Sequence, residues 1–258
     1  MPRRRGRPTE PESLRIAREP LIAELQLACA ASHAALALPP GDRNRELEDL
    51  FFRASASLEG FLTDWFVRCL SFDTSQFVDA FERRAENQAL RDLGRWQPAN
   101  RLWGRKKRKP VVSVAIPLDN RLSQTEASAY LGWGGSTHSF RDAGELQKDA
   151  TQYLALRFSN RVAQLTNGQK RVLDGVIKIR NLLAHRSARG VTEMNQALAH
   201  AQLFSGLRRG AHSVSATGVG NYLRAVHTGQ PRFHLYYEEM GKITYALAPG
   251  APTPPICP

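Results

Sequence analysis

Between residues 44 and 70, apolar side chains recur with the three-to-four-residue spacing of a helix that buries a broad face. Charged residues occupy the opposite face, and Asp73 and Thr74 then signal a new helix start. The segment therefore predicts a long core helix. Its apolar stripe consists of Leu47, Leu50, Phe51, Leu58, Phe61, Leu62, Trp65 and Phe66.

Helical patterns continue along most of the remaining chain, and no repeat at a solenoid period is found. A Ser-x-x-Glu capping box, Ser123 and Glu126, marks one helix start. The stretches near Pro231 and Lys242 are expected to be short strands or irregular. The sequence thus predicts an all-α helical bundle. Helices are expected over residues 13–38, 44–70, 75–93, 123–131, 141–165, 191–207 and 218–226, and in a segment that follows Gly168 and ends near His185.

One helical domain is expected over residues 13–245, with a basic insertion at 95–123 and a C-terminal helical extension at 191–245. Residues 1–12 are predicted to form a basic, disordered N-terminus. Residues 246–258 contain the proline-rich sequence "APGAPTPPICP" and are predicted to be a disordered tail.

The charge balance is strongly basic. The formal net charge is +12 and the isoelectric point is about 10.2, which predicts attraction to polyanions, with nucleic acid as the first candidate. An unbroken basic run lies in the insertion and is expected to contact RNA phosphates, although a solvated loop would have the same composition. The run consists of Arg105, Lys106, Lys107, Arg108 and Lys109.

Cys29, Cys69 and Cys257 are odd in number and far apart, so no disulfide framework is expected and a reducing cytoplasm fits. Neither a hydrophobic stretch of about 18 residues nor a signal peptide is recognised, so no membrane association is expected. The seven histidines show no metal-binding spacing with each other or with cysteine, and neither a metal nor a cofactor is predicted.

Arg180 is out of place in the segment that ends near His185. On a helical projection it falls among Leu173, Val176, Ile177, Leu183 and Ala184, which form the apolar face. A guanidinium stays protonated and is costly to bury without a partner. Arg180 therefore needs a special environment.

Arg180, Asn181 and His185 form the pattern R-N-x-x-x-H, which resembles the R-x(4–6)-H signature of the HEPN superfamily. The sequences "ASASLEGFLTDWFVRCL" and "WGGSTHSF" are similar to its RiboL-PSP-HEPN branch, and the likeness covers residues 44–187. The resemblance implies a HEPN-like bundle that forms a homodimer with a composite active site. It also implies a metal-independent endoribonuclease that acts as a toxin or anti-phage effector, with an antitoxin or defence-system protein as a further partner.

The chemistry of these residues agrees with RNA cleavage. The 2′-hydroxyl of RNA is an internal nucleophile, so His185 can act as base or acid while Arg180 neutralises the phosphorane. Asn181 could hold His185 or the phosphate, and Arg186 is assigned to RNA binding. The expected products carry a 2′,3′-cyclic phosphate and a 5′-hydroxyl. Glu59 is the preferred ion-pair partner of Arg180.

Two alternatives remain open. Asp64 could pair with Arg180 in place of Glu59, and His185 could simply cap a helix end while Arg180 forms an internal ion pair. The protein would then be a non-catalytic helical module that dimerises and binds nucleic acid or a partner protein. On an ideal helix His185 lies about 140° from Arg180. The nuclease hypothesis therefore expects unwinding within "RSARG", residues 186–190, to turn the imidazole back.

Overall fold

The computed structural model describes residues 9–96, 122–131, 139–250 and 255–257. The fold is all-α, as predicted: among the described residues there are ten α-helices, one 3₁₀ turn and one two-stranded ribbon. No helix in these ranges is both long and apolar enough to cross a membrane. The helices are α1 (Glu10–Ala35), α2 (Pro40–Phe72), α3 (Ser75–Trp96), α4 (Gln124–Tyr130), α5 (Ala143–Tyr153), α6 (Leu156–Ala163), α7 (Asn167–His185), α8 (Ala188–Leu198), α9 (Val219–Arg224) and α10 (Arg232–Leu247).

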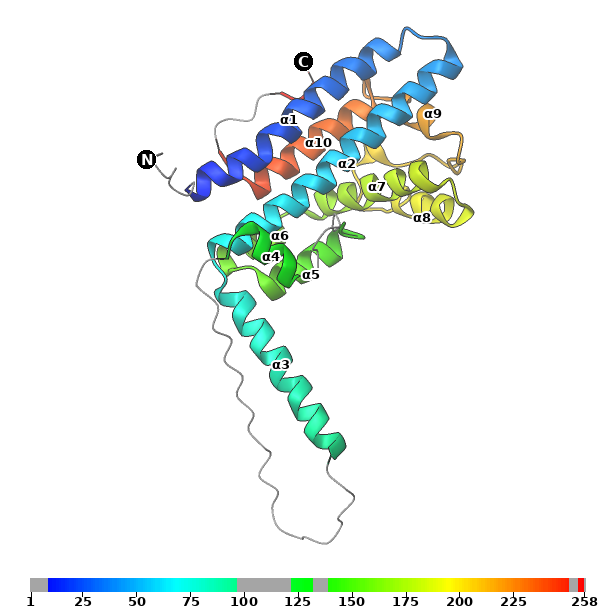
Figure 1. The fold of residues 1–258 in the computed structure, drawn as a ribbon. Helices are drawn as coiled ribbons and strands as arrows, with labels where there is room; N and C mark the ends of the chain where they lie inside the picture. The colour runs from blue at the N-terminus through cyan, green and yellow to red at the C-terminus, as the bar shows by residue number, and fades with distance from the viewer. Residues whose placement is uncertain (1–8, 97–121, 132–138, 251–254, 258) are drawn as a thin grey trace.

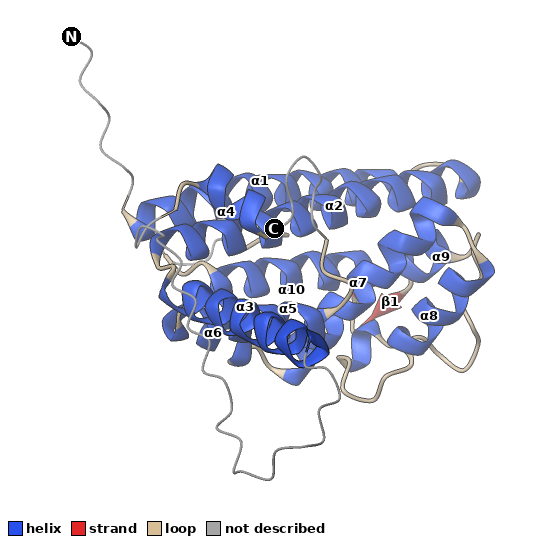
Figure 2. Cartoon of the chain, turned by 60° about the horizontal axis from the view of Figure 1, so that its bottom comes forward, coloured by secondary structure: helices blue, strands red, loops and turns tan. Residues whose placement is uncertain are grey.

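Four helices, α1, α2, α7 and α10, form the central bundle (Figures 1 and 2). Helix α2 packs against α1 and α7, and α10 packs against α1 and α7. Large side chains fill the space between them. Phe51 and Tyr236 meet edge to face with ring centroids 5.3 Å apart, and Trp65 Nε1 donates to Leu247 O at 2.9 Å.

The smaller elements cover the two ends of this bundle, and α3 projects away from it (Figure 1). Helices α8 and α9 lie at one end, and α4, α5 and α6 at the other. The 3₁₀ turn Ser205–Leu207 and the antiparallel strands β1 (Val226–His227) and β2 (Gln230–Pro231) connect α8, α9 and α10.

Several predicted elements are confirmed, with shifted ends. The long core helix is α2, and the capping box of Ser123 and Glu126 forms at α4. The expected helix over 141–165 is instead two helices, because Leu154 adopts an extended conformation with φ −95° and ψ 142°. The helix expected over 191–207 begins at Ala188 and ends at Leu198.

The C-terminal region differs most from the prediction. Residues 232–247 form the single helix α10, although strands or irregular structure were expected near Pro231 and Lys242. The aromatic and β-branched composition favours strands. However, the buried side chains recur at three- and four-residue intervals, and this period fits a helix. They include Phe233, Tyr236, Tyr237, Met240, Ile243 and Leu247.

Both chain ends are more ordered than expected where they are described. Helix α1 already begins at Glu10, within the segment predicted to be disordered. Near the other end Ile256 and Cys257 are buried, and Cys257 forms a disulfide with Cys29. No disulfide framework was expected, and this single disulfide was not predicted because the two cysteines lie 228 residues apart and only the fold brings them together.

Candidate functional site

Helix α7 positions the predicted site residues Arg180, Asn181 and His185. A capping box of Thr166 and Gln169 satisfies its N-terminus. Its apolar side chains are buried in the bundle, which fixes the rotation of α7 about its own axis. They are Val172, Leu173, Val176, Ile177, Ile179 and Leu182.

Arg180 faces α2 from this fixed helix. Its Nη2 lies 3.5 Å from Glu59 Oε2, its Nη1 donates to Asn181 Oδ1 at 3.1 Å, and its guanidinium carbon lies 5.7 Å from the Phe52 ring centroid. The predicted pairing with Glu59 is therefore confirmed. Asp64 instead accepts from Arg68 Nε at 2.7 Å, so the alternative partner is occupied.

The ion pair leaves Arg180 incompletely satisfied. Its buried Nε has no hydrogen-bond partner among the described residues, and Nη2 is too far from Glu59 for a short charge-assisted hydrogen bond. An arginine has five N–H donors in a fixed planar arrangement. Arg180 is thus held in place, and because its side chain is 27% exposed, part of it remains open to solvent.

Glu59 is the more buried partner, with a side chain 9% exposed against 27% for Arg180. Burial raises the pKa of the Glu59 carboxyl above its usual 4.5, and the opposing attraction of Arg180 is the smaller effect. The carboxylate is therefore not stabilised as it would be in a tight bidentate pair.

His185 is exposed at the last position of α7. Unwinding was expected within residues 186–190, and α7 does stay helical through His185, with Arg186 as its C-cap residue. Arg186 then takes a left-handed conformation with φ 47°, and Ser187 caps the N-terminus of α8. Residues 188–190 form the first turn of α8, so residues 186–187 alone make a tight link between the two helices. This link does not turn the imidazole back towards Arg180, and the two side chains remain about 140° apart around the helix axis.

Asn181 lies between the other two motif residues on the surface of α7. It is one position after Arg180 and four before His185, so it is about 40° from His185 around the axis. Its side-chain oxygen accepts from Arg180. The structure therefore shows Asn181 orienting the guanidinium.

Arg186 has an intramolecular role that the sequence did not reveal. Its Nη2 donates to Glu48 Oε2 at 2.6 Å and its Nη1 donates to Ala216 O. The other oxygen of Glu48 accepts the backbone N–H of Gly220 at 2.9 Å. Glu48 thus joins the residue after His185 to the start of α9. Arg186 was predicted to bind RNA, and at least part of its guanidinium is used within the chain.

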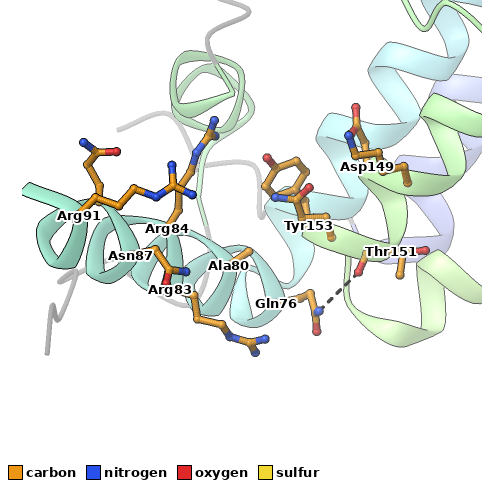
Figure 3. Close-up of a pocket in the computed structure, with 12 residues that line it drawn as sticks. Gln76, Ala80, Arg83, Arg84, Asn87, Arg91, Asp149, Thr151 and Tyr153 are labelled. Carbon is orange, nitrogen blue, oxygen red and sulfur yellow. Dashed lines mark hydrogen bonds between the residues drawn. The ribbon is translucent and has the colours of Figure 1, made fainter. Parts of the chain in front are cut away.

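A basic groove lies between α3 and α5, away from the predicted motif (Figure 3). Its volume is about 800 Å³. Arg83, Arg84 and Arg91 line it from α3 (Figure 3), and α5 contributes Lys148 and Asp149. Gln76 Nε2, from α3, donates to Thr151 O, from α5, at 3.5 Å and so links the two walls of the groove (Figure 3). The basic run from Arg105 to Lys109 lies outside the described residues.

Candidate metal ligands gather at a different place, where α1 meets α10. The ligand atoms of Cys29, His33 and His234 all lie within 4.8 Å of one another. The same holds for His234, Glu238 and Cys257. These groups are remote in sequence from Arg180.

Comparisons of the chain with protein-family models, curated proteins and solved structures gave no match. The resemblance to the HEPN superfamily thus depends on the sequence motif and its segment.

Proposed function

We propose that the protein is a homodimeric, metal-independent endoribonuclease of the HEPN type that acts in the cytoplasm as a toxin or anti-phage effector. The observation that carries the proposal is the state of Arg180. It is anchored by Glu59 and Asn181 on an otherwise apolar face, and its side chain is still 27% exposed. A guanidinium has five N–H donors, so one that is paired with a single carboxylate at 3.5 Å and remains partly exposed keeps donors for a phosphate.

The free donors of Arg180 suit a phosphate undergoing in-line attack. The 2′-hydroxyl of the RNA attacks its own phosphorus, and the guanidinium neutralises the charge that builds up on the non-bridging oxygens. An imidazole removes the 2′-proton, and another protonates the leaving 5′-oxygen. The exposed His185 is accessible for either step. The products are a 2′,3′-cyclic phosphate and a 5′-hydroxyl.

A second copy of the chain resolves the geometry of the motif. Within one helix His185 and Arg180 lie about 140° apart, so one protomer does not readily aim both at the same phosphate. A twofold axis beside α7 would bring one copy's His185 towards the other copy's Arg180. The half-buried Phe52 and Leu183 and the exposed Ala184 supply apolar surface near Arg180 for such a contact.

The test is cleavage of end-labelled RNA by the full-length protein without divalent cations. Because general acid–base catalysis contributes roughly 10²–10⁴-fold, His185→Ala should slow cleavage by that order. Arg180→Ala should slow it as well. His212→Ala and Arg189→Ala are the matched controls, since both side chains are exposed.

Mass spectrometry should find 2′,3′-cyclic phosphate ends, and light scattering should find a dimer. Equal cleavage by the wild type, His185→Ala and Arg180→Ala would overturn the proposal.

The groove between α3 and α5 favours a second candidate, a non-catalytic module that binds nucleic acid. Its arginines could neutralise phosphates without any role for His185. In that case Arg83→Ala with Arg84→Ala should weaken RNA binding and reduce its salt dependence, while His185→Ala should leave binding and any cellular phenotype unchanged.

A further inference from the structure

Two cysteines and two histidines converge where α1, α10 and the C-terminal segment meet. Cys29 and His33 are four residues apart on α1 and therefore share one face of that helix. His234 comes from α10, and Cys257 from the segment 255–257. The distances within the two overlapping groups, together with the Cys29–Cys257 disulfide, place all four candidate ligand atoms in one small volume.

The two imidazoles are arranged as ligands of a common ion would be. His33 Nε2 and His234 Nδ1 lie 3.3 Å apart, which is long for a nitrogen–nitrogen hydrogen bond. Two nitrogens bound at about 2.0–2.1 Å to a tetrahedral zinc ion are separated by ~3.3–3.4 Å, which follows from the tetrahedral angle. The observed separation therefore matches an edge of that tetrahedron.

The C-terminal segment is held at this place by contacts that do not depend on the disulfide. Glu238 Oε1 accepts from the backbone N–H groups of Ile256 at 3.0 Å and Cys257 at 2.8 Å. The side chain of Ile256 packs against Gly241, where a Cβ atom would lie only 2.6 Å from Ile256 Cγ1. Gln26 Nε2 also donates to Pro255 O at 3.3 Å. Cys257 should therefore stay beside Cys29 when the disulfide is opened.

We propose that Cys29, His33, His234 and Cys257 bind one zinc ion when the Cys29–Cys257 disulfide is reduced. Two thiolates and two imidazoles form a tetrahedral ligand set that suits zinc. The Cα atoms of the cysteines are 5.7 Å apart, so rotation of their side chains can separate the sulfurs to the ~3.8 Å expected for Zn–S bonds of about 2.3 Å. The site is closed by four protein ligands and is structural, because no position is left for water or substrate.

The exchange between the disulfide form and the zinc-bound form conserves electrons and protons. A thiol or phosphine reductant supplies two electrons, and two protons from solvent convert the disulfide to two thiols. Zinc binding then displaces those two protons as the thiols become thiolates. In the reverse direction an oxidant such as diamide accepts two electrons from the thiolates and two protons from solvent, and Zn²⁺ is released.

Glu238 is a positioning residue in this proposal. Its carboxylate fixes the backbone of Cys257 without being required as a ligand. Partners of this kind commonly change metal affinity by about 10–100-fold when they are replaced. Glu238→Ala should therefore weaken zinc binding within this range while leaving the four ligands in place.

The experiment uses the full-length protein, reduced with a phosphine, incubated with zinc chloride and desalted. Mass spectrometry of the metal should give about one zinc per chain, with X-ray absorption distances of about 2.3 Å to sulfur and 2.0–2.1 Å to nitrogen. Oxidation with diamide should release the ion.

The informative variant is His33→Gln, because His33 is exposed and its loss should not disturb the bundle. It should bind zinc at least tenfold more weakly in competition with a chromogenic chelator, yet form the disulfide and melt like the wild type when oxidised. His212→Gln, at another exposed histidine, should bind zinc normally. The proposal fails if wild type and His33→Gln retain equal zinc, if the ion has no sulfur ligands, or if diamide releases none of it.

Discussion

Replacing Glu48 tests how the chain is held immediately after His185. Glu48→Ala removes the acceptor of two hydrogen bonds, one from Gly220 N–H at 2.9 Å and one from Arg186 at 2.6 Å. Gly220 is buried in the first turn of α9, where backbone N–H groups have no partner within the helix. Leaving this donor unsatisfied should cost about 1–3 kcal/mol.

The contribution of Arg186 is smaller because its side chain is 45% exposed, against 10% for Glu48. Once released, the guanidinium is solvated by water, so loss of this ion pair should cost about 0–1 kcal/mol. Together the two effects predict that Glu48→Ala lowers the free energy of unfolding by roughly 1–4 kcal/mol. Glu48→Gln keeps an oxygen for Gly220 and should cost only ~1 kcal/mol.

Urea unfolding followed by circular dichroism and tryptophan fluorescence measures these differences. Glu46→Ala is the matched control, because Glu46 is exposed on the same helix and its loss should change stability by no more than about 0.5 kcal/mol. If Glu48→Ala is as stable as Glu46→Ala, the inferred role of the carboxylate is refuted. If Glu48→Gln is as unstable as Glu48→Ala, the negative charge of Glu48 contributes more to stability than its hydrogen bond with Gly220.

Two further predictions concern residues of the candidate site. Arg186→Gly and Arg186→Ala both remove the contact with Glu48, but glycine adopts the left-handed conformation at φ 47° without strain. Urea unfolding should therefore show the Arg186→Gly variant to be more stable than the Arg186→Ala variant by about 1 kcal/mol. Equal stabilities of the two variants would contradict this. Burial raises the pKa of Glu59 above 4.5, so the folded protein binds more protons than the unfolded one as pH falls towards that value. When the pH is lowered from 7 to 5, the melting temperature of the wild type should therefore rise relative to that of Glu59→Gln. A relative fall would mean that the attraction of Arg180 outweighs the effect of burial on the pKa of Glu59.

The sequence predicted helices correctly where apolar residues keep the helical spacing over a long segment. Helix α2 follows from its apolar stripe, and the need of Arg180 for a partner follows from the cost of burying a guanidinium alone. The choice of Glu59 over Asp64 depended on the segment that resembles the HEPN superfamily. Helix α10 was missed because its aromatic residues favour strands locally, whereas packing against α1 and α7 selects the helix. The break at Leu154 had no glycine or proline to announce it.

Contacts between distant segments could not be read from spacing. Glu48 meets Arg186 across 138 residues, and this contact helps to set how α7 ends. The cysteine and histidine cluster was missed for the same reason. Metal-binding patterns are recognised from short spacings, but this cluster combines ligands from α1, α10 and the chain end. Only the folded arrangement shows them together.

The two proposed sites lie on different helix pairs, and this separates their tests. Arg180 and Glu59 lie between α7 and α2, whereas His33 and His234 lie between α1 and α10. A chelator that removes structural zinc from the reduced protein could reduce RNA cleavage by loosening the fold, without any metal in the reaction. The His33→Gln variant in its oxidised form distinguishes these causes, because the disulfide fixes the C-terminal segment while the metal site is impaired. If this form cleaves RNA at the wild-type rate in the presence of chelator, catalysis is metal-independent whatever the zinc content of the native protein. If zinc binds as proposed but neither His185→Ala nor Arg180→Ala alters cleavage, the nuclease assignment fails and the metal site stands.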